Sequence, residues 1–201
     1  MLDGTHALVL ALPRGGVPVA FEVARALHLE LDVFPVRKLG MPGDEELAIG
    51  ALASGNVRVL NQDLMTYLHV PEDLVDRITA REQEELRRQE ALYRADRPAI
   101  EARGRTVVLI DDGLATGATM LAGARALKAM GAARIVVAVP VAARQTCDQF
   151  RKEGYEVVCV STPSPFEAVG IWYEDFSQIS DDQVRKYLEE ASQVSVTHQA
   201  R

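Results

Sequence analysis

The chain has 201 residues, 48% of them apolar and 25% charged, which is the composition of a folded domain with a sizeable core. Its 22 basic and 29 acidic residues give a net charge of −7, which argues against non-specific binding to nucleic acid or to a membrane surface. The sequence has no apolar run of about 18 residues and no signal-peptide pattern, so we expect a cytoplasmic protein. Cys147 and Cys159 lack metal-ligand spacing, and we expect buried, reduced thiols.

The first half of the chain mixes short apolar runs with a polar segment. In chain order we expect a strand over 6–13, a helix over 17–30, a strand over 31–38, a loop over 39–46 and a hairpin over 47–61 whose turn is Ser54, Gly55 and Asn56. Pro71 then opens a long polar helix that reaches about Ala95. Its thin apolar stripe indicates either a solvated arm or a packing helix.

The second half alternates strands and helices regularly. We expect a strand over 106–111, a helix over 119–132, a strand over 134–141, a helix over 142–154 and a strand over 155–161. This alternation predicts βαβ units and a parallel sheet, in which ligands bind beyond the carboxyl ends of the strands. Loops 13–16, 38–46 and 111–119 fall there. We expect one α/β domain over 1–194, with an insertion at about 41–100 and a flexible tail over 195–201.

One stretch, "VVLIDDGLATGATM" at 107–120, carries the strongest chemical signal. Its small residues allow a ligand to approach the backbone, and the start of the following helix offers N–H groups to an anion. Thr116 and Thr119 add hydroxyl donors. Asp111 and Asp112 would repel a bare phosphate, but they suit a sugar phosphate whose hydroxyls they can bind. The alternative is an ordinary polar turn, in which two carboxylates at a strand end would be costly.

Two other phosphate-binding motifs do not fit this loop. A Walker-type loop needs Gly-Lys followed by Ser or Thr, and Lys is absent here. The dinucleotide motif needs three spaced glycines, and only Gly113 and Gly117 are present.

The stretch resembles the ribose-phosphate signature of the type I phosphoribosyltransferases. The resemblance implies that Asp111 and Asp112 bind the 2′ and 3′ hydroxyls of phosphoribosyl pyrophosphate. It also implies that the loop binds the substrate's 5′-phosphate through Ala115, Thr116, Gly117, Ala118 and Thr119, and that Gly113 is a further substrate-binding residue. The implied fold is a central, mostly parallel sheet flanked by helices, with a hairpin and long-helix insertion and a C-terminal hood.

Other segments between residues 7 and 175 extend the resemblance. "LALPRGGVPVA" is similar to the family's pyrophosphate loop, in which Gly15 and Gly16 permit an unusual backbone and Arg14 can bind a phosphate. "VRKLGMPGDEELAIGAL" matches the position of the family's mobile catalytic loop. Arg37 and Lys38 could neutralise the leaving pyrophosphate there, or could be ordinary surface charges.

The acceptor side is less defined. Glu45 and Glu46 could accept a proton from the incoming base, or could be solvated loop carboxylates. The segment 165–182 lies where the family places its base-binding hood, and Trp172 could stack on a base or simply pack. Ala115 stands where the hypoxanthine-guanine branch has an Asp. The sequence Ala-Thr-Gly instead resembles the adenine and uracil branches, so a 6-oxopurine substrate is disfavoured.

The sequence thus predicts transfer of a ribose 5-phosphate group to a nucleobase-like acceptor, with release of pyrophosphate. "ALPRGGVPVA", "VRKLG", "ELAIGA" and "YEDFSQISD" further resemble a bacterial subgroup, some of whose members are fused to hydrolase domains. Mg²⁺ is the expected cofactor, bound mainly through the substrate and without a dedicated protein metal motif. The family also suggests a homodimer.

Two alternatives remain open. One is a regulator that binds phosphoribosyl pyrophosphate without transferring it, although the chain has no basic stripe or DNA-binding helix motif. The other is a phosphate-ester hydrolase, which would need an Asp-x-Asp pattern or clustered metal ligands, and neither is found in the sequence.

Overall fold

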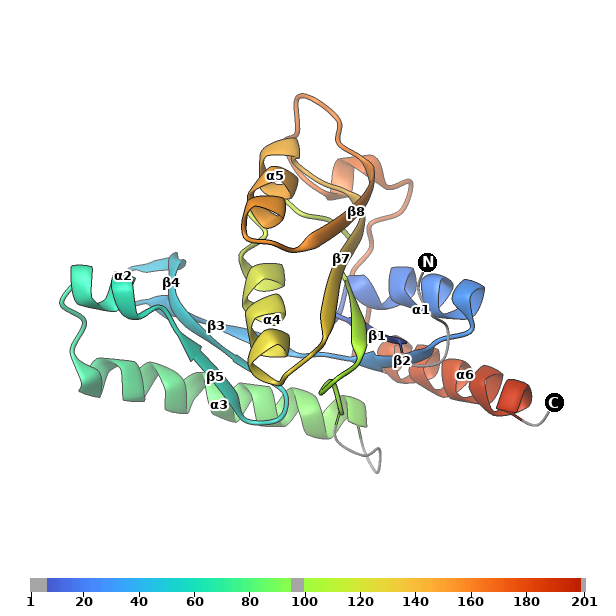
Figure 1. The fold of residues 1–201 in the computed structure, drawn as a ribbon, viewed down its shortest axis with the longest axis horizontal. Coiled ribbons are helices and arrows are strands. Elements are labelled where there is room, and N and C mark those ends of the chain that lie inside the picture. The colour runs from blue at the N-terminus through green and yellow to red at the C-terminus, as the bar shows by residue number, and fades with distance from the viewer. Residues whose placement is uncertain (1–6, 95–99, 200–201) are drawn as a thin grey trace.

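The computed structural model of the chain describes residues 7–94 and 100–199, and a five-stranded parallel sheet forms its centre (Figure 1). The strand order is β2-β1-β6-β7-β8, and every neighbouring pair is parallel. The strands are β1 (Ala7–Ala11), β2 (Glu30–Val33), β6 (Thr106–Ile110), β7 (Arg134–Val141) and β8 (Glu156–Ser161). The predicted parallel sheet is therefore confirmed.

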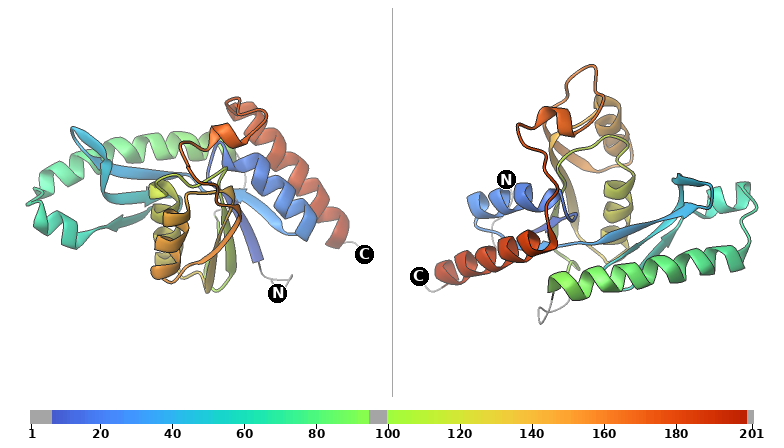
Figure 2. Two further views of the ribbon diagram at one scale, coloured as in Figure 1. Left: turned by 90° about the horizontal axis from the view of Figure 1, so that it is seen from above. Right: turned by 180° about the vertical axis from the view of Figure 1, so that it is seen from behind.

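Helices cover both faces of this sheet, and the apolar runs in the strands explain why. Side chains alternate between the faces, so that Leu8 and Leu10 of β1 join one core cluster and Val9 joins the other. Helices α4 (Ala118–Ala129) and α5 (Arg144–Lys152) pack on the first face. Helices α1 (Gly16–Leu27) and α6 (Asp181–Gln199) pack on the second and lie side by side (Figure 2).

A second, antiparallel sheet projects from this body as an arm (Figure 1). It contains β3 (Val36–Met41), β4 (Asp44–Ala53) and β5 (Val57–Leu60), followed by α2 (Gln62–Tyr67) and α3 (Glu72–Arg94). The predicted hairpin between β4 and β5 is confirmed, with Gly55 and Asn56 at positive φ in its turn. The predicted long helix is also confirmed. It is a packing helix, because Val75, Ile78 and Leu86 are buried against the arm.

Three expectations differ from the structure. The strand expected over 31–38 is two strands, β2 and β3, which belong to different sheets and are separated by Phe34 and Pro35. The loop expected over 39–46 is mostly strand, because Leu39 is fully buried in the arm's core and only a turn at Pro42 and Gly43 interrupts the pairing. The backbone of 195–199, expected to be a loose tail, is the last part of α6.

Two smaller expectations concern the thiols and the membrane. Cys147 is buried, whereas Cys159 is partly exposed, and both are free thiols. Within 7–94 and 100–199, the structure has no helix whose length and apolar content would let it cross a membrane.

The chain connections diverge in opposite directions from the neighbouring strands β1 and β6. From β1 the chain passes through α1 to β2 on one side, and from β6 it passes through α4 to β7 on the other. Ligands of open α/β sheets bind where connections diverge in this way. The loops after β1 and β6 are two of the three singled out in the sequence.

Candidate functional site

The loops after β1 and β6 are in direct contact, and this contact depends on two glycines. A Cβ atom on Gly15 would lie 1.9 Å from Asp112 Oδ2. A Cβ atom on Gly16 would lie 2.7 Å from the Ile110 carbonyl oxygen and 2.8 Å from Asp111 Cα. A Cβ on Gly16 would overlap backbone atoms, and a Cβ on Gly15 would displace the Asp112 carboxylate, so the two glycines let the expected pyrophosphate loop pack against the acids.

The surroundings of the acid pair disfavour the charged form of both carboxyl groups. Burial, and then the proximity of Asp112, raise the pKa of Asp111 to about 8, although the Asp112 N–H donates a hydrogen bond to Asp111 Oδ1 at 2.9 Å. Burial likewise raises the pKa of Asp112. Hydroxyl donors from a ligand would compensate this burial, and a sugar diol supplies two of them.

The base of the loop after Asp112 is fixed to the rest of the fold. Leu114 is buried in the core and forms an isolated parallel bridge with Ala142. The Thr146 hydroxyl of α5 donates a hydrogen bond to the Ala115 carbonyl oxygen at 2.5 Å. Gly117 has φ +72°, and a Cβ there would lie 2.7 Å from Thr146 Cγ2. The loop is therefore held in one shape before any ligand arrives.

The tip of this loop is open to solvent and suited to an anion. Ala115 and Thr116 are exposed, and Ala118 and Thr119 are half-buried in the first turn of α4. The N–H groups at a helix start lack partners within the helix and attract negative charge. The predicted 5′-phosphate cradle therefore lies at an exposed loop tip and a helix start, and its ligand stays a prediction.

Arg14 reaches from the first loop toward the start of α6. Its Nη1 lies 3.6 Å from Asp181 Oδ1, and the Tyr93 hydroxyl donates a hydrogen bond of 2.6 Å to the same oxygen. The peptide bond between Pro13 and Arg14 is cis. Sequence reasoning did not identify Tyr93 or Asp181, because they are 88 positions apart and meet only in the folded chain.

Arg37 and Lys38 of β3 line a cavity together with Thr119 at the start of α4. The cavity has a volume of about 420 Å³, and α3 adds Arg81 and Glu82 to its lining. This cavity places several cations beside the start of α4.

Glu82 fixes part of this basic cavity. It is buried, and its Oε2 accepts a hydrogen bond from Arg37 Nε at 2.9 Å and lies 2.8 Å from Arg37 Nη2, while Oε1 accepts from Arg81 Nε at 2.9 Å. Sequence reasoning missed Glu82 and Arg81. A signal was available, since Glu82 stands at helical spacing between the buried Ile78 and Leu86, inside the apolar stripe of α3.

The C-terminal hood closes over the acid pair. The Tyr173 hydroxyl donates a hydrogen bond of 2.6 Å to the Asp112 carbonyl oxygen. Burial, and then the charges of Asp112 and Asp111, raise the pKa of Tyr173 to about 12, so the phenol keeps its proton. Val169 occupies the space that a Cβ on Gly113 would need, with Cγ1 at 2.6 Å.

The structure describes the two predicted parts of the acceptor side, Trp172 and the pair Glu45 and Glu46, to different extents. Trp172 lies in the short helix η1 (Gly170–Trp172), next to Tyr173, and 46% of its surface is exposed, so its ring is accessible to a partner. The backbone of Glu45 and Glu46 belongs to β4, but their side chains lie outside the part of the chain that the structure describes.

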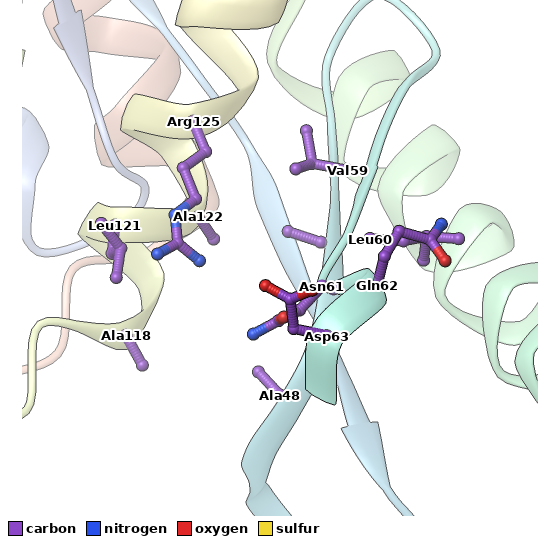
Figure 3. A pocket seen from close by; sticks show the side chains of 12 residues that line it. Ala48, Val59, Leu60, Asn61, Gln62, Asp63, Ala118, Leu121, Ala122 and Arg125 are labelled. Atoms are coloured by element: carbon purple, nitrogen blue, oxygen red, sulfur yellow. The ribbon is translucent and has the colours of Figure 1, made fainter. Parts of the chain in front are cut away.

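A second hollow lies on the arm side of α4 (Figure 3). This groove of about 630 Å³ runs between α4 and the segment from β4 to α2, and small or apolar residues form most of its walls. Arg125 extends toward it from α4, but Arg125 Nη2 also lies 3.0 Å from Glu153 Oε2. Asn61 Oδ1 accepts a hydrogen bond from the Leu64 N–H at 3.1 Å. The groove shares Ala118 with the phosphate loop, so it adjoins the candidate site formed by that loop and the acid pair.

The site can accept Mg²⁺ but does not form a protein cage for it. No cluster of three or more His, Cys, Asp or Glu side chains that could hold a metal occurs among the described residues. Asp111 and Asp112 offer adjacent carboxylates, the oxygen ligands that Mg²⁺ uses together with substrate phosphates. The donor set fits an ion carried mainly by its substrate.

Comparisons with known proteins agree with this geometry. The family model of the phosphoribosyl transferase domain matches residues 2–174. A Mycobacterium tuberculosis protein with a provisional phosphoribosyl transferase name is 45% identical over 190 residues, which cover 94% of this chain and 43% of the relative. The chain thus spans less than half of that relative's length. A ribose-phosphate pyrophosphokinase of Methanopyrus kandleri is 38% identical over 76 residues, which cover 36% of this chain and 26% of the relative.

A solved structure shows the same fold along nearly the whole chain. The protein TT1426 from Thermus thermophilus is similar with a TM-score of 0.86 and 44% identity, covering 94% of this chain and 88% of the other. The predicted type I phosphoribosyltransferase fold, a mostly parallel sheet flanked by helices, is confirmed.

Proposed function

We propose that this chain, which belongs to the phosphoribosyl transferase family, transfers the ribose 5-phosphate group of phosphoribosyl pyrophosphate to a nitrogen of a nucleobase-like acceptor and releases pyrophosphate. The observation that carries the proposal is the contact between Gly15, Gly16 and the acid pair at the ends of β1 and β6. This contact would set a diol site beside a pyrophosphate site, and the loop before α4 would complete it with a phosphate cradle.

Asp111 and Asp112 would accept hydrogen bonds from the 2′ and 3′ hydroxyls of the ribose. Residues 115–119 would bind the 5′-phosphate through backbone N–H groups and the hydroxyls of Thr116 and Thr119. The sugar is then held at both ends, so its C1 carbon faces the acceptor in one orientation. As the bond to pyrophosphate breaks, positive charge develops on the ribose ring, and the two carboxylates stabilise it.

The leaving group needs positive charge and backbone donors. Arg14, Gly15 and Gly16 would bind the pyrophosphate from one side, and Arg37 and Lys38 would approach it from the arm. Mg²⁺ would supply further positive charge to the pyrophosphate when bound, and Asp111 and Asp112 are the carboxylates that could help to hold it. Closing of the arm over the site would exclude water.

The acceptor would bind under the hood, where Trp172 offers a flat apolar surface. Glu45 or Glu46 would accept the proton that the acceptor nitrogen loses. Ala115 leaves the phosphate loop without a carboxylate, which favours acceptors of the adenine or uracil type over 6-oxopurines. We further propose that the protein is cytoplasmic and forms a homodimer. Light scattering on the purified protein tests the homodimer.

The experiment is a pyrophosphate-release assay with phosphoribosyl pyrophosphate and Mg²⁺ against adenine, guanine, hypoxanthine, xanthine, uracil and orotate. Release with one base, and its loss in the double variant Asp111→Asn with Asp112→Asn, is the expected result. Each acid would accept a charge-assisted hydrogen bond from a hydroxyl, so their joint loss should weaken substrate binding about 100-fold or more. Calorimetric binding without turnover on any acceptor would instead indicate a regulator, and no binding would exclude both.

A further inference from the structure

We infer that Asp181 is the counter-ion of Arg14 in the free protein and that pyrophosphate displaces it from that guanidinium. The inference rests on the proposed function, because it assigns Asp181 the task of setting how tightly Arg14 holds the leaving group. Asp181 is thus a positioning residue, which acts on the ligand through Arg14.

The pair has the geometry of an exchangeable contact. Arg14 Nη1 and Asp181 Oδ1 are 3.6 Å apart, which is beyond hydrogen-bonding distance. Each side chain is about one-third exposed, at 35% and 33%. A loose, partly hydrated ion pair costs little to separate, and a pyrophosphate offers Arg14 more charge and a bidentate geometry.

The carboxylate itself is held in place by a partner other than Arg14. Tyr93 is buried at the end of α3, and its hydroxyl donates a hydrogen bond of 2.6 Å to Asp181 Oδ1. Asp181 also interacts electrostatically with Arg88, one turn earlier on α3. Asp181 therefore keeps a donor and a positive neighbour when the guanidinium leaves it.

Three distant segments converge on this contact, namely the loop after β1, the end of α3 and the start of α6. A fixed negative charge beside a pyrophosphate-binding arginine weakens anion binding and favours product release. Removing that charge should therefore strengthen pyrophosphate binding. The expected change is roughly two- to five-fold, the size of a partly exposed ion pair.

The test compares Asp181→Asn with Asp182→Asn by calorimetric titration with inorganic pyrophosphate in the presence of Mg²⁺. Asp182 is a matched control because it lies in the same first turn of α6 and pairs with Arg185 instead. Neither change removes the helix cap, since the Gln183 N–H donates to Ser180 Oγ at 3.2 Å. We expect tighter pyrophosphate binding in D181N, no change in D182N, and equal melting temperatures.

A double-mutant cycle shows whether the effect passes through Arg14. In an Arg14→Gln background, D181N should no longer change the affinity for pyrophosphate. Weaker or unchanged binding in D181N, or an equal gain in D182N, overturns the counter-ion role while leaving the proposed function intact. A wild-type protein that binds neither pyrophosphate nor phosphoribosyl pyrophosphate overturns both. If the melting temperature of D181N is lower than that of the wild type, Asp181→Ser must show the same gain in affinity for pyrophosphate for the inference to stand.

Discussion

The two sides of the candidate site are built by different means. On the sheet side, backbone meets backbone, and Gly16 packs so closely on Asp111 that no Cβ fits between them. On the arm side, long side chains meet, and Arg37 is positioned by an ion pair with Glu82 of α3. The sheet side belongs to the main core, whereas the arm joins that core through Ala53 and has a second, small core of its own.

This difference separates two tasks. A site made of packed backbone and half-buried acids is preorganised, which suits recognition of the ribose and the 5′-phosphate. A site made of long cations on an arm can adjust its position, which suits capture and release of a charged leaving group. Substitutions on the two sides should therefore fail in different ways.

The largest expected effect is that of Gly16→Ala. Its Cβ would overlap the Ile110 carbonyl oxygen and Asp111 Cα, which are backbone atoms that cannot turn aside. We expect a loss of about 3 kcal/mol or more in the free energy of unfolding, measured by urea denaturation. Gly43→Ala, in the turn between β3 and β4, is the control from the arm. No atom lies within 4 Å of its Cβ, and only its φ of +87° opposes the change.

We expect Gly43→Ala to cost about 1–2 kcal/mol, the penalty for a left-handed backbone. Equal losses in the two variants would show that the sheet side is no more tightly packed than the turn. The comparison between the two regions would then have no basis in packing.

The sheet side could largely be predicted from the sequence, and the reason is physical. Continuous apolar runs such as 107–110 are typical of strands buried on both faces, and a parallel sheet places the loops after such strands at one edge. Asp111 and Asp112 come immediately after such a run. Local sequence was therefore enough to bring the acids and the phosphate loop to the binding edge.

The arm side could be predicted only in part, because its contacts join residues that are far apart in the chain. Arg37 and Glu82 are separated by 45 positions, and the local sequence around either residue does not predict the other as its partner. The Gly and Pro content of 39–46 predicted a loop, but pairing with β4 and the burial of Leu39 outweigh it. Lone polar residues inside an apolar stripe, such as Glu82, were the one available clue.

The second expected effect is a pH dependence that belongs to the sheet side. The folded-state pKa of Asp111, about 8, lies above its ordinary value of 3.8, so the folded protein holds a proton that the unfolded chain releases. The stability from this group is present below pH 3.8 and is lost as the pH rises through 8. Asp111→Asn removes this loss, and we expect its melting temperature at pH 8 to exceed that of the wild type by about 5 °C.

The measurement is a series of melting curves between about pH 4 and pH 8.5 without ligand, a range that spans most of this loss of stability. Asp182→Asn removes one exposed carboxyl elsewhere and controls for the change in net charge. If wild type and Asp111→Asn lose stability in parallel as the pH rises, Asp111 is not the group responsible.

The smallest expected effect lies on the arm side, with Glu82→Gln. The amide keeps the shape of the side chain but loses the charge that pairs with Arg37 and Arg81. We expect a loss of about 1 kcal/mol in the free energy of unfolding. The more telling measurement is a pair of calorimetric titrations, with ribose 5-phosphate and with phosphoribosyl pyrophosphate. Only the second ligand carries the leaving group, so only its affinity should fall, by a few-fold, because Arg37 loses the hydrogen-bonded partner that positions it.

Glu85→Gln is the matched control for this variant, since Glu85 lies one turn further along α3 and pairs with Arg88. It should leave both affinities unchanged. A Glu82→Gln protein that weakens ribose 5-phosphate as much as phosphoribosyl pyrophosphate would show that the arm also shapes the sugar site. The two sides would then act as one unit, since a charge lost on α3 would be felt by the acids at the end of β6.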